Sequence, residues 1–518
     1  MKKSVAICYP PLDTQKGTPL LGQNRQFQWA NDPWYAYPVV PAYGATMLKN
    51  AGFNVSWLDG IAQEQSYPKW LTKLINIKPD LIIIETKTPV VKYHWKIIRE
   101  IKKKLPQSNI VLMGDHVTAL PEESFKKCPV DFIITGGDFD FLMLSIANHL
   151  AKKTKLCAGI YYRQANKIKN TGKFKLNHNL DKLPFIDRKL TKWKLYAYKN
   201  SNYIKTPGTY TMFGRDCWWG KCTFCSWTTL FPGKQFRVMS VKRALDEIGH
   251  ILGNYPVVEI MDDSGTFPVG KWLTDFCKGV IKRGYHKKIQ IDCNMRFNAG
   301  LTQQNYRLMK KAGFRFLLYG LESANQETLN KLNKNLKVEQ ISKYAKIAKQ
   351  AGLWPHATVM VGYPWETKKQ AKNTINLAKD LFQKGFIDTL QATVVIPYPG
   401  TPLFKQCQKN NWLKTTDWNK YDMRQPIMKT KMSNIEINSL VREIYNSIWT
   451  PQFILRKLKE GLTDWSKFKY YTWLALKFFS KKLDFAGQKQ NNKILLLASK
   501  IVRQITKITN DRDGPCHS

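Results

Sequence analysis

Three of the ten cysteines in the 518-residue chain stand within nine positions of one another. They are Cys217, Cys222 and Cys225, in the stretch GRDCWWGKCTFCSW. Three soft thiolates in one compact loop can hold three corners of a cubane iron–sulfur cluster, which leaves the fourth iron free to bind a small molecule. The spacing therefore favours a [4Fe–4S] site with one open iron.

Two other metal sites have the same ligand type and remain as alternatives. A structural zinc site has four Cys or His ligands, yet no Cys or His pair at finger spacing stands near this loop. The spacing C-x4-C-x2-C also begins a plant-type [2Fe–2S] pattern, which needs a fourth cysteine. The next cysteine, Cys277, comes 52 residues after Cys225 in an expected helix, and Cys293 lies on an expected core strand.

Six strand–helix units are expected to position this loop. The expected strands are 208–213, 256–261, 289–294, 315–320, 356–361 and 389–396, and the helices between them begin near Ser240, Val269, Thr302, Asn325 or Val338, and Thr367. Six parallel βα units predict an incomplete (β/α) barrel over residues 206–410. Functional residues of such barrels gather at the C-terminal ends of the strands. The segments at those ends here are the cysteine loop, Asp262-Asp263, Asn294-Met295-Arg296, Glu322-Ser323, Gly362-Tyr363 and Pro397–Thr401.

These segments together resemble one enzyme family. The cysteine loop, with an aromatic residue before its last cysteine, and the stretches NMRF, LLYGLES, HATVMVGYPWET and ATVVIPYPGTPL resemble the radical S-adenosylmethionine (SAM) enzymes over roughly residues 205–410. One departure is that the family's usual motif has three residues between its first two cysteines, whereas this chain has four. Gly220 lies in that gap and permits an unusual turn.

The resemblance implies a mechanism and a set of roles, although it assigns no catalytic side chain. Cys217, Cys222 and Cys225 are expected to hold a [4Fe–4S] cluster whose open iron binds SAM, and one electron then cleaves SAM to a 5′-deoxyadenosyl radical. The expected SAM contacts are the Phe224 backbone and Gly362 at adenine, Asp262 or Asp263 at the methionine ammonium, Arg296 at the carboxylate, and Glu322 at the ribose or ammonium. Tyr398 is expected to contact substrate. A structural salt bridge is the alternative for each charged residue, and core packing is the alternative for Tyr398.

Residues 1–150 alternate strands and helices, which predicts a doubly wound, Rossmann-like parallel sheet. Its expected strands are 4–8, 53–59, 79–86, 109–114 and 130–136. The stretches VVPAYGATMLKNAGFNVSWLD, MGDHVTALPEES and DFIITGGDFD resemble the cobalamin-binding domain that often precedes a radical SAM barrel. The residues expected to line the cobalamin site are Gly114, His116, Thr118, Gly136 and Gly137. A satisfied surface histidine is the alternative for His116. The loop YPPLDTQKGTPL contains no histidine, so we expect no histidine from it beneath the cobalt.

This pairing of cofactors favours methylation of an unactivated carbon in a small-molecule or lipid-like substrate. Relatives in the family also use cobalamin for ring contraction or cyclisation, and this remains an alternative, as do radical SAM modification of RNA and a non-catalytic iron–sulfur role. An electron donor such as flavodoxin or ferredoxin is an expected partner.

The rest of the chain is expected to form a connector over 151–205 and a basic, mostly helical region over 411–518. The formal net charge is +44, and YNSIWTPQFILRKLKEGL mixes lysines with large apolar residues. Basic amphipathic helices of this type bind anionic membranes, whereas helices packed on the barrel with lysines outward are the alternative. The N-terminal stretch has too few consecutive apolar residues to form the apolar region of a signal peptide. We therefore expect a cytoplasmic protein, with peripheral contact at the inner face of the membrane as a further expectation and nucleic acid as a less favoured partner.

Overall fold

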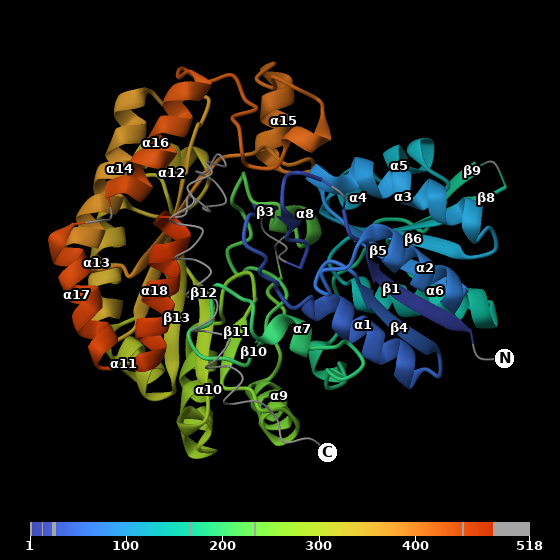
Figure 1. Cartoon of the computed structure of the whole chain (residues 1–518), viewed down its shortest axis with the longest axis horizontal. Helices are drawn as coiled ribbons and strands as arrows, with labels where there is room; N and C mark the ends of the chain where they lie inside the picture. The colour runs from blue at the N-terminus through green and yellow to red at the C-terminus, as the bar shows by residue number, and fades with distance from the viewer. Residues whose placement is uncertain are drawn as a thin grey trace.

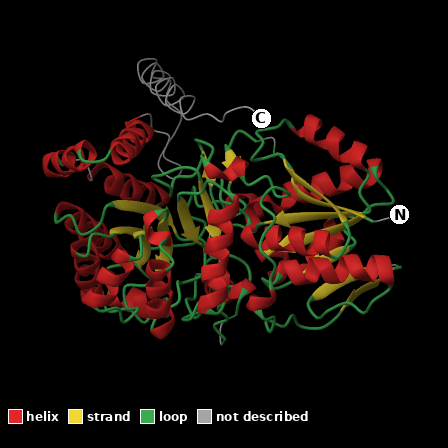
Figure 2. Cartoon of the chain, turned by 90° about the horizontal axis from the view of Figure 1, so that it is seen from below, coloured by secondary structure: helices red, strands yellow, loops and turns green. Residues whose placement is uncertain are grey.

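The computed structural model describes residues 3–12, 14–22, 27–165, 167–232, 235–447 and 450–479. Two sheets, each flanked by helices, form the two halves of the molecule (Figures 1 and 2). The N-terminal half is blue to cyan in Figure 1, and the barrel half runs from green to red. This is the α/β architecture that the sequence predicts.

The N-terminal sheet has the strand order β4-β1-β5-β6-β7-β8-β9. Its parallel strands are β1 (Ser4–Tyr9), β4 (Asn54–Asp59), β5 (Leu81–Thr86), β6 (Asn109–Gly114) and β7 (Phe132–Ile134). All five predicted strands are therefore confirmed. All six residues of β5 are buried, as expected for a parallel strand covered on both faces. The helices that follow the strands are α1 (Val39–Asn50), α2 (Tyr67–Ile77), α3 (Val91–Lys104), α4 (Asp115–Ala119), α5 (Pro121–Lys127) and α6 (Phe139–Lys152).

Two further strands of this sheet come from the segment that we expected to be a connector. β8 (Ile160–Gln164) pairs antiparallel with β7, and β9 (Lys167–Asn170) pairs antiparallel with β8. Most residues of these two strands are half-exposed or exposed, so IYYRQ and KIKN carry little hydrophobic signal, and the sequence indicated only short β-like pieces within the connector.

The second sheet contains six parallel strands in chain order, as the incomplete (β/α) barrel requires. They are β10 (Gly208–Thr211), β11 (Glu259–Asp262), β12 (Gln290–Met295), β13 (Phe314–Glu322), β14 (Trp354–Val361) and β15 (Thr389–Val394). The helices between them are α8 (Trp227–Leu230), α9 (Val241–Asn254), α10 (Lys271–Lys282), α11 (Gln303–Lys311), α12 (Gln326–Lys331), α13 (Val338–Gln350) and α14 (Lys368–Gln383). The predicted helix starts at Ser240, Thr302 and Thr367 are N-cap residues whose hydroxyls accept backbone N–H bonds.

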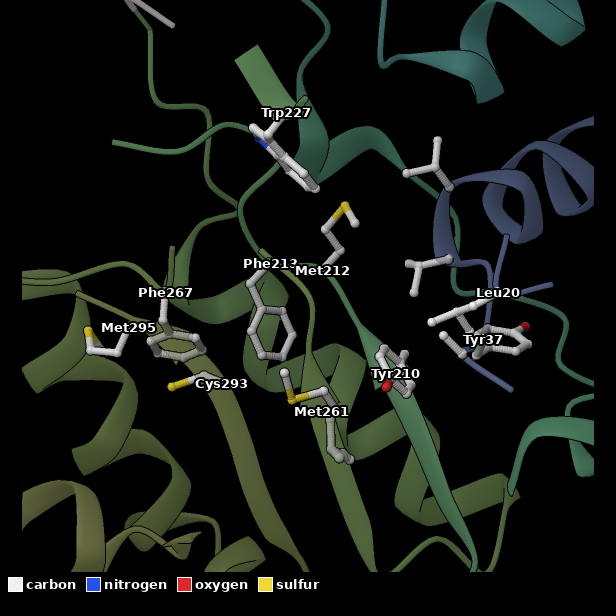
Figure 3. Packing of buried hydrophobic residues seen from close by; sticks show 14 of the residues in the cluster. Leu20, Tyr37, Tyr210, Met212, Phe213, Trp227, Met261, Phe267, Cys293 and Met295 are labelled. Atoms are coloured by element: carbon white, nitrogen blue, oxygen red, sulfur yellow. The ribbon is translucent and has the colours of Figure 1, made fainter. Parts of the chain in front are cut away.

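A continuous apolar core joins the two halves. Leu20 and Tyr37 of the N-terminal half lie beside Tyr210 of β10, and the core continues through Phe267 and Cys293 (Figure 3). Cys293 is fully buried, so the expectation that it belongs to the core is confirmed.

Residues beyond the barrel contact both halves. α15 (Pro402–Lys409) follows the last strand, and η4 (Trp418–Lys420) packs on η1 (Thr88–Val90) and α3 of the N-terminal half. The ion pairs Lys92–Asp417 and Lys16–Asp422 fasten this segment there. α16 (Asn434–Ser447), α17 (Pro451–Leu462) and α18 (Trp465–Phe479) then return to the barrel (Figure 1). Within the described ranges, no helix combines the length and the apolar character needed to cross a bilayer.

Candidate active site at the barrel mouth

The cysteine loop leaves the end of β10 and lies across the mouth of the barrel. Thr223 fastens it on two sides, because its N–H donates to the Leu332 carbonyl at 3.0 Å and its carbonyl accepts from Leu403 N–H at 2.9 Å. Trp219 Nε1 donates to the Asn333 carbonyl at 2.7 Å. Gly220 has φ +59°, a left-handed conformation that suits glycine and accommodates the four-residue gap. The loop is thus held by segments 331–335 and 402–409.

The three thiols of this loop are half-buried. Cys217 Sγ lies 3.2 Å from Thr266 Oγ1, and Arg296 Nη1 lies 3.8 Å from Cys222 Sγ. Burial raises the pKa of Cys222, while Lys334 and Arg296 act in the opposite direction and favour its thiolate. In the part of the chain that the structure describes, no three His, Cys, Asp or Glu side chains are grouped closely enough to hold a metal ion. Ligation by the three cysteines therefore stays a prediction.

Arg296, at the end of β12, is the cation next to these thiols. Its guanidinium packs against the rings of Trp218 and Trp219, at 5.4 and 5.1 Å from their centroids. It also donates to the Lys334 carbonyl and to Asn298 Oδ1. The side chain is therefore fixed at the cysteine loop, where a planar fork of donors can bind a carboxylate.

The Asp262 carboxylate is used within the chain. It is fully buried and accepts bonds from Thr211 Oγ1 at 3.1 Å, Phe213 N–H at 2.8 Å and Ser264 N–H at 3.1 Å. Burial raises its pKa to about 6 against these hydrogen bonds. Asp262 thus joins the ends of β10 and β11, and Asp263 beside it is also buried.

Glu322 stands at the end of β13 in a strained conformation. Its φ of +65° is rare for a residue with a side chain. Lys334 Nζ donates to Glu322 Oε1 at 2.6 Å, and both side chains are about nine-tenths buried. A Cβ on Gly320 would lie 2.1 Å from Glu322 Oε1, so only glycine permits this carboxylate to fold back. Strain of this kind is typical of functional sites.

The remaining predicted residues of the barrel lie around the same rim. Phe224 packs against the apolar cluster that contains Leu332 and Tyr363, with Lys334 Nζ 5.9 Å from its ring centroid. Gly362 has φ +93° at the end of β14. Tyr398 is buried, and burial together with the nearby Asp115 carboxylate raises the pKa of its hydroxyl. Asp115 belongs to the N-terminal half, so Tyr398 lies where the two halves meet.

The predicted cobalamin residues lie at the carboxyl ends of β6 and β7. Gly114 has φ +132°, and a Cβ there would lie 1.9 Å from the Thr86 carbonyl oxygen. Thr118 Oγ1 donates to the Gly114 carbonyl at 2.7 Å and accepts from Gly136 N–H at 3.2 Å. The Thr118 hydroxyl therefore hydrogen-bonds to the backbone at the carboxyl ends of both β6 and β7.

Aromatic side chains of the chain itself pack on this edge. Cβ atoms on Gly136 and Gly137 would meet the rings of Phe174 and Phe231 at 2.5 and 2.1 Å. His116 is fully buried beneath Trp418, with Nδ1 3.3 Å from Thr88 Oγ1 and Nε2 3.2 Å from Glu123 Oε2. The structure therefore places His116 as a satisfied buried histidine, not as a side chain that faces open space.

An ionic cluster connects this edge to the root of the cysteine loop. Arg215, two residues before Cys217, donates to Asp138 and Asp140, which flank the start of α6. Arg237 Nη1 donates to Asp138 Oδ2 at 2.6 Å, and its Nε donates to Asp216 Oδ2 at 2.9 Å. All of these carboxylates and Arg215 are buried. The N-terminal half thus holds the base of the loop that carries the cysteines.

Sequence reasoning missed Lys334 and this ionic cluster. Lys334 is one of many scattered lysines, so nothing in its sequence context marks it. The signal for the cluster was present, since GRDC places two charges directly before a cysteine and GDFD places two carboxylates after a strand. Pairing them across 75 positions requires the tertiary structure.

Comparison with known proteins agrees with this arrangement. Residues 211–378 match the family model described as the radical SAM superfamily. The chain is 29% identical to the uncharacterized methyltransferase PH0819 of Pyrococcus horikoshii, over 82% of this chain and 90% of that protein. It is 25% identical to the anaerobic magnesium-protoporphyrin IX monomethyl ester cyclase of Cereibacter sphaeroides, over 76% of this chain and 64% of that protein. The solved structure of the cobalamin-dependent SAM radical enzyme OxsB, with aqua-cobalamin and SAM bound, superposes with a TM-score of 0.66 at 14% identity, and the match covers 100% of this chain and 82% of that chain.

Proposed function

We propose that this chain, which belongs to the radical SAM superfamily and has the fold of a cobalamin-dependent member, is an enzyme that methylates an unactivated carbon of a small or lipid-like molecule. Its cofactors in this proposal are a [4Fe–4S] cluster, SAM and cobalamin. The observation that carries the proposal is the loop of three cysteines, fixed over the barrel mouth beside Arg296 and Lys334.

The residues of the barrel mouth fit the cluster and SAM in chemical type. Cys217, Cys222 and Cys225 hold the cluster, and the two neighbouring cations lower the cost of a thiolate in a partly desolvated position. When bound, the cluster and SAM together supply the radical that abstracts hydrogen from the substrate. Arg296 binds the SAM carboxylate and Gly362 lies against the adenine. Asp262 or Asp263 is the ammonium contact, and Glu322 is the ribose or ammonium contact.

The N-terminal edge fits cobalamin in position. α4 contacts α8 of the cysteine loop, so a cofactor at this edge faces the barrel mouth directly. Gly114, Thr118, Gly136 and Gly137 supply backbone and a hydroxyl, and binding there requires the Phe174 and Phe231 rings to move off the two glycines. When bound, cobalamin supplies the methyl group. His116 retains its Thr88 and Glu123 partners, so it shapes the loop without ligating cobalt.

Methyl transfer is preferred because a relative similar over most of the chain is named a methyltransferase. A second candidate is a cyclisation or rearrangement, which is favoured by the similarity to a cyclase. An electron donor such as flavodoxin or ferredoxin supplies the electron in either case.

The test is anaerobic reconstitution with iron, sulfide and cobalamin, followed by incubation with SAM and a reductant. We expect 5′-deoxyadenosine to accumulate, because the cysteine loop lies at the barrel mouth beside Arg296, the proposed partner of the SAM carboxylate. An intact cluster with no SAM cleavage contradicts the proposal. Comparison of extracts from wild-type and deletion strains then separates the two candidates, since loss of a single methyl unit from a product indicates methyl transfer and loss of a ring indicates cyclisation.

We further propose that α17 contacts an anionic membrane surface. Its exposed apolar residues lie on one side of the helix and continue into α18, namely Ile454 (41% exposed), Leu455 (67%), Leu458 (51%), Leu462 (84%) and Trp465 (61%). The formal net charge of +44 complements anionic lipid, and Lys459 is exposed on the same helix. A basic helix with such a face lies in the membrane interface.

The protein is expected to float with phosphatidylglycerol vesicles and not with phosphatidylcholine vesicles, and less so at high salt because ions screen the attraction. The double variant L455E/L462E is expected to bind at least about tenfold less, since burial of each leucine contributes about 1.5–3 kcal/mol. I435E is the matched control, because Ile435 is 77% exposed on α16, outside this face. Wild-type binding that L455E/L462E leaves unchanged, or no binding to anionic vesicles, contradicts the proposal.

A further inference from the structure

A largely apolar cavity of about 310 Å³ lies between β15 and the helices α14, α16, α17 and α18. Its apolar walls include Leu390 of the strand, Phe382 of α14, Phe453 of α17 and Ala475 of α18. For comparison, an apolar cavity of about 150 Å³ engineered in another protein binds benzene. This cavity is therefore large enough for an organic molecule, and it lies in the size range of ligand pockets.

The cavity is separate from the barrel mouth. Thr389 and Leu390, which line it, are the first residues of β15, and Asp388 directly precedes them. The mouth residues, such as Tyr398, follow the other end of that strand. Six residues of strand span about 20 Å, so the cavity belongs to the opposite end of the barrel from the cysteine loop.

One residue that lines the cavity, Asp388, has a carboxylate oxygen without a hydrogen-bond partner among the described residues. Asp388 is 2% exposed, and its Oδ1 accepts from Lys349 Nζ at 2.6 Å and from Lys457 Nζ at 2.7 Å. Asp388 Oδ2 is buried and has no hydrogen-bond partner among the described residues. Buried oxygens are usually satisfied, and an acceptor of this kind is satisfied by a ligand that donates.

The cavity opens on the surface of α17. Ile454 and Leu458 line it and are also 41% and 51% exposed. Both side chains at this opening are aliphatic, whereas Asp388 is buried. The entrance is therefore suited to a molecule that dissolves in apolar surroundings.

We infer that this cavity binds a hydrophobic alcohol, that is, an apolar molecule whose single hydroxyl donates to Asp388 Oδ2. The aliphatic and aromatic walls bury the hydrocarbon part, and Asp388 supplies the hydrogen-bond acceptor. An anionic head group is disfavoured beside Asp388. This ligand site is independent of the proposed methyl transfer, since it lies outside the barrel mouth.

Equilibrium dialysis of the full chain with 1-decanol and with 1-methoxydecane tests the inference, because the ether has a similar chain but no donor. We expect saturable binding of one decanol per chain and binding of the ether at least about tenfold weaker, since the ether leaves the buried oxygen unsatisfied. Equal affinity for the two probes, or no saturable decanol binding, overturns the inference.

Two variants that fill the cavity locate the site. A475F and T472F each add a ring from the α18 wall and are expected to abolish decanol binding, whereas S466F adds the same ring on α18 away from the cavity and is expected to leave it unchanged. Circular dichroism establishes that each variant is folded. Unchanged decanol binding in a folded filling variant overturns the inference, and if neither folds, the comparison of alcohol with ether on the wild type still decides it.

Discussion

Replacement of any one of Cys217, Cys222 and Cys225 by alanine is expected to abolish the [4Fe–4S] cluster and, with it, SAM cleavage. The loop offers three thiols, so loss of one leaves two ligands for a cluster that needs three from the protein here. Iron content is expected to fall from about four per chain to near zero, and 5′-deoxyadenosine to background. Iron analysis, visible absorbance and product quantification after anaerobic reconstitution measure this.

The matched control is C157A, because Cys157 is a free, exposed cysteine outside the loop. It is expected to retain wild-type iron and activity. If C157A loses as much iron as the loop variants, or if a loop variant keeps a full cluster, the assignment of the three ligands fails. A zinc site would give zinc in place of iron, and a [2Fe–2S] cluster would give about two irons per chain. The same metal analysis therefore separates the three sites that the cysteine spacing allows.

Arg215→Ala is expected to lower the free energy of unfolding by about 3–5 kcal/mol, the usual cost of breaking a buried ion pair by removing one partner. It leaves the Asp140 carboxylate buried without the arginine that binds both of its oxygens. Lys242→Ala is the control, since its pair with Asp246 is exposed and such pairs contribute about 0.5 kcal/mol or less. Urea denaturation measures both. A loss below about 1 kcal/mol in Arg215→Ala contradicts the structural role.

The same ionic cluster predicts a pH dependence. Burial alone would raise the pKa of Asp138, but the hydrogen bond from His178 and the charges of Arg215 and Arg237 outweigh it and hold the pKa well below its usual range. A carboxyl with a lowered pKa stabilises the fold fully above its unfolded pKa of about 4 and loses that contribution as the pH falls further. The wild type is therefore expected to lose stability below about pH 4, and Arg215→Ala to lose less over the same range.

Arg215 is a positioning residue, because it holds the base of the cysteine loop through Asp138 and Asp140. Arg215→Lys keeps the charge but cannot make the bidentate contact, so its iron content and stability are expected to lie between those of the wild type and Arg215→Ala. If stability falls while cluster loading and SAM cleavage per folded chain stay at the wild-type level, the ionic cluster is structural only.

Much of the barrel could be predicted because its signals are local. Buried parallel strands are short apolar runs, and hydroxyl residues such as Thr302 and Thr367 mark where helices begin. The order of strands then follows, since consecutive βα units pack side by side with one handedness. Because of that order, the strand ends at Asp262, Met295 and Glu322 lie at one rim of the barrel, together with the polar residues there.

The hydrogen-bond partners of the site side chains could not be predicted from such local signals. Asp262 and His116 were expected at ligand sites, with a structural role as the alternative for each, and neighbouring backbone and side-chain groups hydrogen-bond both of them in the fold. Hydrogen-bond partners are chosen among all atoms within about 3 Å, and most of those belong to distant parts of the chain.

The sequence by itself determined the two βα series, the cysteine loop and the chemistry that three thiolates with a missing fourth can perform, because spacing and periodicity act over a few residues. Only the tertiary structure decided that Arg215 meets Asp138 and Asp140, that Lys334 neutralises Glu322, and that residues 417–422 close on the N-terminal half. Charges pair wherever folding brings them together with water excluded, and that depends on the packing of whole elements.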